Sequence, residues 1–577
     1  MSVDSRFMPE DRDQRFSRIA ENGAFDVIVV GGGINGIGVF RELSLQRLRV
    51  LLVEKNDFCS GCSAAPSRMI HGGLRYLENG EFSLVRESLQ ERDALLQNAP
   101  HMVRSLPTTV PIRSVFSGVM NGVANFLHLQ TKPAERGALM IKAGLTMYDW
   151  VTRRRRVLPT HDFRGPRKTR EQWPHLRKDT RFTATYYDAW ISHPERLGLE
   201  LLDDSEAANC ASVALNYVCL ATGDDGALTL KDNETGASWP VSTKTIVNAT
   251  GAWVDVTAAQ LPGQYDTATP MVEGTKGSHL VIDNPELSDA LGGHMIFYEN
   301  SDGRVCILFP YLSKVLVGAT DIRVNAPGRT RCEEEETSYI LQSLAGVFPD
   351  ICVTQSQIVF SYSGIRPLPK SDQEFTGRIS RGHFVKRLDG PVPQFCMVGG
   401  KWTTFRAFAE QTTDDVLHEL GMPRVCDTLK LPIGGGRDYP EDSQSWVSET
   451  CAKFSVSAER ARHVLDHYGS NAHSVLTACN ATPGDTSLAP DCPYSVAETA
   501  FLIRSGRTVH LADIVFRRTA LAITGQISTD IIARVTAIAA ECLGWDAARQ
   551  NMETASLISE LGEYHGVCQQ TLSNRSK

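Results

Sequence analysis

The sequence contains no apolar run of the roughly 18 residues that a membrane-spanning helix requires. Its first 21 residues mix acids with arginines and lack an apolar core, unlike a secretory signal or an acid-poor transit peptide. No internal repeat and no low-complexity segment is present. We therefore expect a cytoplasmic protein that begins with a disordered lead at residues 1–23.

The fourteen cysteines lack the spacing of a disulfide framework. One close pair occurs, Cys59-Ser-Gly-Cys62, and no second C-x-x-C or C-x-x-H motif follows it. We therefore expect no zinc site and no other metal site. The pair is either a redox dithiol beside a cofactor or two cysteines of a loop that lines a cofactor site.

Acidic residues outnumber basic ones overall, but one segment is strongly basic. The net charge of the 577 residues is −8, whereas residues 153–181 hold eleven Lys/Arg against three Asp/Glu. A basic block in an acidic protein indicates an anionic partner surface, either a membrane or a nucleic acid. An apolar helical face between residues 137 and 151, with Trp150 and Arg153–Arg156 at its end, is typical of a helix lying in a membrane interface; a core helix followed by a solvated charge run is the alternative.

What the sequence does contain at its start is a dinucleotide-binding βαβ unit. A β-branched run at Val27–Val30 predicts a buried parallel strand, and Gly31, Gly33 and Gly36 follow it as G-x-G-x-x-G. These glycines allow a tight turn, a close approach to a pyrophosphate and close helix–strand packing. A second buried strand ends at Glu54, where a carboxylate accepts ribose hydroxyls and disfavours the 2′-phosphate of NADP.

Several charged residues and one tyrosine stand beside glycines or where strands run into loops. They are Arg75, Tyr76, His279, Arg366, Arg381 and Lys401. Each one alone is most simply a surface residue, but together they predict recognition of an anion such as phosphate or carboxylate.

Seven motifs resemble the FAD-dependent glycerol-3-phosphate dehydrogenases, which deliver electrons to quinone. In this sequence they read Gly31-Gly-Gly-Ile-Asn-Gly-Ile-Gly38, Met69-Ile-His-Gly-Gly-Leu-Arg-Tyr-Leu-Glu78, Val247-Asn-Ala-Thr-Gly251, Lys276-Gly-Ser-His279, Gly318-Ala-Thr-Asp321, Tyr362-Ser-Gly-Ile-Arg-Pro-Leu368 and Gly399-Gly-Lys-Trp-Thr-Thr-Phe-Arg406. Their order matches the family across residues 24–410. The C-terminal region matches more weakly, chiefly through Asp513-Ile-Val-Phe-Arg-Arg-Thr519.

The resemblance implies an α/β fold with a Rossmann-like FAD-binding domain of the glutathione-reductase type, an antiparallel substrate sheet and a C-terminal all-helical domain. Strand patterns at residues 278–282, 305–309, 315–318 and 358–362 predict the substrate sheet. The helical pattern from Ser528 to Gly544, with both caps, is the clearest of the C-terminal region. The predicted domains are 24–107, 185–262 and 363–415 for FAD, 108–184 and 263–362 for substrate and membrane contact, and 425–577 for the helices.

The resemblance also implies a reaction and roles for residues. Hydride leaves C2 of sn-glycerol 3-phosphate for the flavin while a base takes the hydroxyl proton, giving dihydroxyacetone phosphate. Arg366 and Lys401 would orient the hydroxyl and stabilise oxyanion charge, and His279 is the most ordinary general base. The substrate set is Arg75, Tyr76, Arg381 and Thr320. The FAD set is Gly31, Gly33, Asn35, Gly36, Glu54, Ser63, Ser67, His71, Gly72, Gly73, Gly251, Gly400 and Thr403.

As for partners, the resemblance implies a phosphate-ester substrate, a quinone acceptor and peripheral attachment to the inner face of the cytoplasmic membrane. Arg153–Arg156 would then face anionic headgroups. We expect no nucleic-acid partner, and a homodimer is possible.

The chain departs from the family pattern near the substrate and flavin. The departures are Ala65-Pro66-Ser67-Arg68, His193-Pro194 and Trp402. They leave open a related polyol phosphate such as an erythritol phosphate. Oxygen as acceptor is a further alternative, and so is a non-catalytic FAD-binding scaffold whose basic block is the functional part; retention of Arg75, Arg366 and Lys401 speaks against the scaffold.

Overall fold

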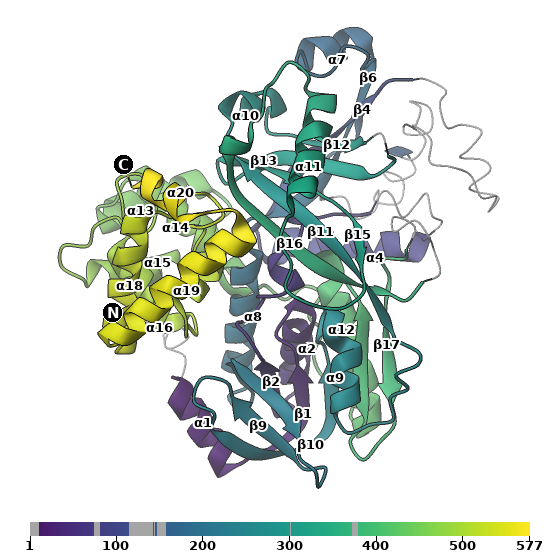
Figure 1. The fold of residues 1–577 in the computed structure, drawn as a ribbon, viewed down its shortest axis with the longest axis vertical. Helices are drawn as coiled ribbons and strands as arrows, with labels where there is room; N and C mark the ends of the chain where they lie inside the picture. The colour runs from purple at the N-terminus through teal and green to yellow at the C-terminus, as the bar shows by residue number, and fades with distance from the viewer. Residues whose placement is uncertain are drawn as a thin grey trace.

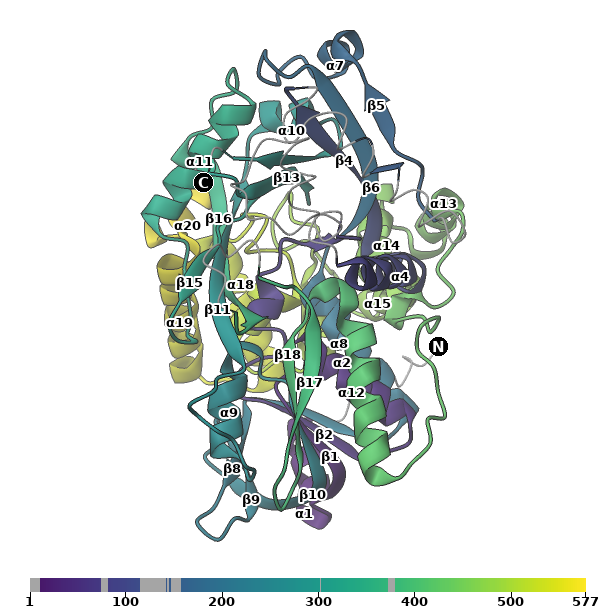
Figure 2. The same cartoon turned by 90° about the vertical axis from the view of Figure 1, so that its right-hand side faces the viewer.

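The computed structural model describes residues 11–73, 81–114, 142, 145–146, 157–300, 302–371 and 379–576. These residues form three packed regions (Figure 1): a sheet with flanking helices at the bottom, a second sheet above it, and a helical region on one side of both. Figure 2 shows helix α12 (Phe405–Leu420) beside the lower sheet and helix α4 (Phe82–Asn98) above it, toward the second sheet.

The first sheet, among the described residues, has the path β17-β18-β10-β1-β2-β7, with the β8–β9 hairpin attached to β10. Its strands are β1 (Ala24–Val30), β2 (Val50–Glu54), β7 (Val213–Asn216), β8 (Val218–Thr222), β9 (Leu228–Asp232), β10 (Ser238–Asn248), β17 (His383–Leu388) and β18 (Gln394–Gly399). Strand β1 lies parallel to both β10 and β2, so Val27, Ile28 and Val29 are fully buried. The β-branched run therefore forms the central strand, as its pattern predicts.

Helices cover both faces of this sheet. They include α2 (Ile34–Leu45), α8 (Pro194–Ala208), α9 (Val254–Gln260) and α12. Helix α2 packs between α8 and α12 and is buried along most of its length, so its glycine-rich N-terminus is fixed against the sheet edge.

The second sheet follows the path β15-β11-β14-β13-β12-β4-β6-β3, with β16 paired to β11 and β5 to β6. Its strands are β3 (Met69–Ile70), β4 (Val103–Ile112), β5 (Asp162–Arg164), β6 (Phe182–Ile191), β11 (Val272–Ile282), β12 (Met295–Glu299), β13 (Val305–Tyr311), β14 (Lys314–Gly318), β15 (Ile322–Val324) and β16 (Ile358–Pro369). Its helices are α7 (Pro166–Gln172), α10 (Pro285–Leu291) and α11 (Glu334–Val347). Its pairs are antiparallel except β12 with β4, which confirms the predicted substrate sheet in its main feature.

Sheet membership differs from the predicted domain boundaries. Strands β3, β4 and β6 and most of β16 pair within the second sheet, although residues 69–70, 103–107, 185–191 and 363–369 were assigned to the FAD-binding domain. Strand patterns show that a segment is extended but not which sheet it joins. The chain thus crosses between the two sheets several times, and the connecting loops lie between the two sheets.

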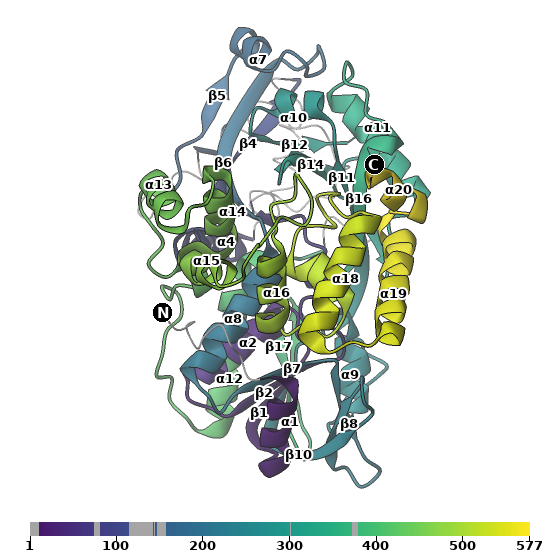
Figure 3. The same cartoon turned by 90° about the vertical axis from the view of Figure 1, so that its left-hand side faces the viewer.

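The C-terminal region is helical, as predicted. Its helices are α13 (Ser443–Phe454), α14 (Ala458–Tyr468), α15 (Ala472–Asn480), α16 (Val496–Ser505), α17 (Leu511–Asp513), the π-helical turn η9 (Ile514–Arg518), α18 (Thr529–Leu543), α19 (Ala547–His565) and α20 (Gln569–Arg575). Figure 3 shows them standing in front of both sheets. Helix α18 has Ser528 as its N-cap and Gly544 in the left-handed conformation at its C-terminal end, which confirms the predicted caps.

The predicted disordered lead is wrong for residues 12–21, which form helix α1 (Arg12–Glu21). Phe16 is buried and stacks on Trp239 with ring centroids 4.2 Å apart, and Arg12 pairs with the buried Asp232 at 2.6 Å. In this helix only Phe16 and Ile19 are both apolar and buried. Two apolar residues are too few for the sequence pattern to predict a helix that packs on the domain.

Candidate active site

A cavity of about 1290 Å³ lies between the two sheets and reaches the C-terminal helices. It opens at the carboxyl ends of β1, β2 and β10, where ligands of open α/β sheets bind. The volume exceeds the roughly 300–1,000 Å³ typical of a single ligand pocket. The cavity is therefore large enough for a cofactor and a small substrate together.

The glycine turn after β1 shows why these positions need glycine. Gly31 has φ +107°, a conformation that L side chains avoid. A Cβ on Gly36 would lie 1.9 Å from the Gly31 carbonyl oxygen, so only glycine lets α2 approach the turn. Glu54 receives the Gly32 N–H at 2.7 Å, and burial raises the pKa of this carboxyl.

The residues around this turn fit FAD. Asn35 Oδ1 is buried and, within the described part of the chain, has no hydrogen-bond partner, so an acceptor faces the cavity unused. Gly400 has φ +96°, and a Cβ there would lie 2.5 Å from Asn35 Nδ2. The turn, the orphaned acceptor and the bare backbone at Gly400 together form a cradle that side chains would fill.

Most of the predicted FAD set lines the cavity. The lining members are Gly31, Gly33, Asn35, Glu54, Ser63, Ser67, His71, Gly73, Gly251, Gly400 and Thr403. Gly36 instead packs α2 on the turn, and the Gly72 N–H bonds Asp188 at 2.9 Å. The Ser63 hydroxyl accepts the Ile34 N–H at 2.9 Å, at the start of α2.

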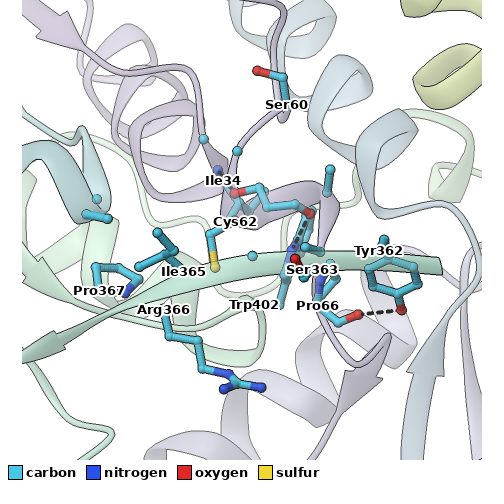
Figure 4. A pocket seen from close by; sticks show the side chains of 18 of the residues that line it. Ile34, Ser60, Cys62, Pro66, Tyr362, Ser363, Ile365, Arg366, Pro367 and Trp402 are labelled. Atoms are coloured by element: carbon cyan, nitrogen blue, oxygen red, sulfur yellow. Dashed lines mark hydrogen bonds between the residues drawn. The ribbon is translucent and has the colours of Figure 1, made fainter. Parts of the chain in front are cut away.

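Two facing glycines shape the substrate end. Gly277 of β11 pairs with Gly364 of β16. A Cβ on Gly277 would lie 2.0 Å from Arg366 Nη2, and one on Gly364 would lie 2.7 Å from Ala65 Cβ. The two bare positions therefore leave room for the Arg366 guanidinium over β11 and for the loop around Ala65 over β16. Figure 4 shows Arg366 projecting from β16, with Cys62 and Pro66 of this loop beside the strand.

Arg366 and Arg381 converge on one carboxylate. Asp321 accepts from Arg366 at 3.1 Å and from Arg381 at 3.4 Å, and both arginines line the cavity. Burial and the neighbouring Arg381 lower the pKa of Arg366, whereas Asp321 raises it. One carboxylate for two guanidinium groups leaves positive charge facing the cavity, which suits an anionic ligand.

Thr320 lines the cavity, but its hydroxyl is engaged by the protein. It donates to Glu336 at 2.6 Å and accepts from the Ser278 N–H at 3.0 Å. Its carbonyl oxygen accepts from Arg366 at 3.4 Å. Within the structure Thr320 thus supports Arg366 and the β11 backbone.

His279 is buried beside Arg366. Its Nε2 lies 3.0 Å from Ser67 Oγ, and its ring stacks on Tyr362 at 4.9 Å. Burial, Arg366 and Arg68 together lower the pKa of His279 to about 3. The imidazole is therefore neutral near pH 7 but is a weak base.

Lys401 follows two glycines with positive φ, at the start of the turn η6 (Trp402–Thr404). Its Nζ donates to Ser88 Oγ at 2.7 Å. Burial lowers the pKa of Lys401 to about 7, with Arg381 acting in the same direction and Glu87 and Glu81 opposing. Near neutral pH this amine exists in both protonation states.

Comparison with known proteins decides the family. Residues 26–406 match the model of the FAD dependent oxidoreductases, and residues 426–550 match that of the C-terminal domain of alpha-glycerophosphate oxidase. A glycerol-3-phosphate dehydrogenase of Synechocystis is 32% identical over 546 residues, covering 91% of this chain and 94% of the relative. The chain belongs to the FAD-dependent glycerol-3-phosphate dehydrogenase family.

Further relatives agree with this assignment. The mitochondrial glycerol-3-phosphate dehydrogenase of Arabidopsis thaliana is 29% identical over 567 residues, covering 92% of this chain and 84% of that protein. The FAD complex of the Bacillus halodurans glycerol-3-phosphate dehydrogenase has a TM-score of 0.73 at 23% identity, covering 96% of this chain and 98% of that one. The enzyme is thus an FAD-dependent oxidoreductase with the fold of this dehydrogenase family.

Some predicted residues of this family member lie outside the described part of the chain. They are Arg75, Tyr76, Trp150 and Arg153–Arg156. Among the helices that the structure describes, none is long and apolar enough to cross a membrane.

Asp321, Asp188 and Ser88 are site residues of this dehydrogenase family member that sequence reasoning missed. Asp321 is the last residue of the motif Gly318-Ala-Thr-Asp321. A carboxylate within a family motif is a signal that could have identified it as a partner of Arg366. Nothing local marks Ser88 or Asp188, because their partners Lys401 and Gly72 lie 313 and 116 residues away.

The Cys59–Cys62 pair also has a place in this dehydrogenase fold. Burial raises the pKa of both thiols, which disfavours thiolate chemistry. Cys59 is packed so closely that a Cβ on Gly198 would lie 2.8 Å from its sulfur, and Cys62 lines the cavity. This packing favours the loop-lining interpretation over the redox dithiol.

Proposed function

We propose that the protein oxidises sn-glycerol 3-phosphate to dihydroxyacetone phosphate and passes the electrons to a membrane quinone. The observation that carries the substrate is the pair Arg366 and Arg381, held by Asp321 in the same cavity as the FAD cradle. The planar guanidinium group of one arginine is well matched to a phosphate, and a second cation beside it can stabilise a developing oxyanion of the same substrate. The names of the relatives support the same substrate.

Bound FAD supplies the hydride acceptor. In our proposal Arg381, together with Arg75 and Tyr76, binds the phosphate. Arg366 stabilises negative charge that develops on the C2 oxygen as its proton leaves. Because Thr320 and Asp321 hold the Arg366 guanidinium from one side, it is oriented before the substrate arrives.

We assign proton removal from the C2 hydroxyl to Lys401 Nζ rather than to His279. A general base works best when its pKa lies near the working pH. The pKa of Lys401 is about 7, whereas that of His279 is about 3. His279 then serves as a neutral hydrogen-bonding group that fixes Ser67 beside the cofactor site.

The acceptor has a second candidate, molecular oxygen. The match of residues 426–550 to a domain named for an alpha-glycerophosphate oxidase favours considering it. Substrate-dependent oxygen uptake with peroxide formation in the absence of quinone would identify an oxidase. Turnover only with a quinone analogue would identify a dehydrogenase.

Peripheral binding to anionic membranes is part of the proposal, and it rests on residues 153–181. In the described portion of this segment Arg167 is highly exposed, with 92% of its side chain accessible. Replacing Arg153–Arg156 by Gln should release the protein from vesicles containing anionic lipid, measured by co-sedimentation. The matched control replaces four exposed lysines elsewhere, Lys231, Lys244, Lys430 and Lys453, and should leave binding unchanged. Equal loss of binding in both variants would contradict a local membrane site.

The direct test of the reaction is anaerobic mixing of the flavoprotein with sn-glycerol 3-phosphate. We expect loss of the oxidised-flavin absorbance and formation of one dihydroxyacetone phosphate for each flavin reduced. An unchanged flavin spectrum at saturating substrate would overturn the proposed function.

A further inference from the structure

The loop at residues 55–67 connects the FAD cradle to the C-terminal helices. It begins directly after Glu54 and contains residues that line the cavity, among them Ser63 and Ser67. Asp57, near its start, is 1% exposed. A buried carboxylate requires partners, and those of Asp57 come mainly from a distant part of the chain.

Two adjacent arginines of the C-terminal domain bind Asp57. Arg518 Nη2 donates to Asp57 Oδ1 at 2.9 Å, and Arg518 Nη1 and Arg517 Nε both donate to Oδ2. Asn216 Nδ2 adds a bond to Oδ1 at 3.0 Å. Burial alone would raise the pKa of Asp57, but the two arginines lower it far below its usual range, so the carboxylate stays charged.

The backbone at these arginines is a π-helical turn, η9. Such turns are rare and often lie at functional sites. Here the turn brings the consecutive residues Arg517 and Arg518 to the same carboxylate oxygen. Arg517 also pairs with Asp513 at 2.7 Å, so the cluster of two arginines and two aspartates is balanced in charge.

The other end of the loop is attached to the FAD cradle itself. The Cys59 N–H donates to the Gly32 carbonyl at 2.9 Å, and the Ser63 hydroxyl accepts the Ile34 N–H. Trp402 Nε1 donates to the Ser63 carbonyl at 3.0 Å. A shift of the loop would therefore move the glycine turn and the start of α2 together.

We propose that the C-terminal helical domain sets the affinity for FAD by holding the 55–67 loop through Asp57, with Arg518 as a positioning residue. Arg518 is fully buried and is absent from the cavity wall, so it acts on the cofactor through the loop. The inference rests on FAD as the cofactor and needs no substrate. Its failure would leave the proposed reaction untouched.

The test compares Arg518→Gln with Arg507→Gln. Arg507 belongs to the same domain, has a side chain 5% exposed, and pairs with Asp203 at 2.7 Å and Glu206 at 2.9 Å on α8. Both substitutions remove a buried arginine that pairs with a carboxylate across the boundary between the C-terminal domain and the FAD-binding region. Only the first removes a contact to the 55–67 loop.

Each purified enzyme is stripped of FAD and then titrated with FAD, and flavin fluorescence reports binding. Hydrogen exchange of the backbone amides of residues 55–67 is measured separately, in the absence of FAD. We expect Arg518→Gln to raise the Kd of FAD by about tenfold or more and to speed exchange in the loop. Arg507→Gln should leave the Kd of FAD within about threefold of the value for the unchanged enzyme. This should hold even if its Tm falls as much as the Tm of Arg518→Gln.

Asp57→Asn keeps the shape of the side chain and removes its charge, so it carries the same test if Arg518→Gln does not fold. It should also raise the Kd of FAD. An unchanged Kd in Asp57→Asn would overturn the proposal, and so would a Kd that rises in Arg507→Gln as much as in the loop variants.

Discussion

At the scale of single residues, the site is determined by what burial does to charge. Lys401 and His279 both lose basicity through burial, but a lysine starts from a much higher value. Burial therefore brings the pKa of the Lys401 amine close to neutral pH and moves the pKa of the His279 imidazole well below it. This is why the base preferred from the sequence, His279, differs from the one we propose.

Lys401 gives a prediction for pH dependence. Below pH 7 the amine is protonated and cannot take the hydroxyl proton, so the rate of anaerobic flavin reduction should rise with pH through about 7. Lys401→Met should remove this acidic limb and slow reduction by about 10²- to 10⁴-fold. An acidic limb that persists near pH 7 in Lys401→Met would assign the proton to another group.

Arg366 gives a prediction for charge stabilisation. Arg366→Ala removes the cation that we propose stabilises the reacting oxygen, and it should slow flavin reduction by about 10²- to 10³-fold while FAD stays bound. Arg387→Ala is the control, because Arg387 is an exposed arginine that pairs with Glu419. Stopped-flow absorbance measures both, and a normal rate in Arg366→Ala would remove this residue from the site.

At the scale of elements, the sequence was informative where a structure depends on neighbouring residues. The strand, glycines and acid of the βαβ unit and the caps of α18 are local patterns, and the structure contains them. The pairing of Arg366 with Asp321 depends on how β16 and β11 align, and the Asp57–Arg518 contact joins residues 461 positions apart. No local pattern reports such contacts.

Helix α1 is the clearest case of an element missed for this reason, and its docking can be tested. Phe16→Ala deletes a buried ring that stacks on Trp239, so the free energy of unfolding should fall by about 3 kcal/mol. Ser17→Ala, on the exposed side of the same helix, should change it by less than about 0.5 kcal/mol. Chemical denaturation measures both; equal effects would mean that α1 does not dock.

At the scale of the whole molecule, three regions meet around one cavity. The first sheet supplies the FAD cradle, the second supplies Arg366, and the C-terminal helices hold the 55–67 loop. The departures Arg68, His193 and Trp402 lie at these junctions. Arg68 pairs with Glu195 at 2.8 Å, the His193 ring packs edge-to-face on His467, and Trp402 donates a hydrogen bond to Ser63. These three residues make contacts that hold parts of the fold together. Their departure from the family pattern is therefore weaker evidence for a different substrate.

The cavity between the two sheets is, in our proposal, the place where a three-carbon phosphate ester is oxidised. Anaerobic flavin reduction with a panel of sn-glycerol 3-phosphate, erythritol 4-phosphate and glycerol tests it most directly. We predict that sn-glycerol 3-phosphate reduces the flavin fastest and that glycerol, which lacks the phosphate for the arginines, is almost inert. Fast reduction by glycerol, or no reduction by sn-glycerol 3-phosphate, would contradict the assignment of a phosphate-ester substrate to this cavity.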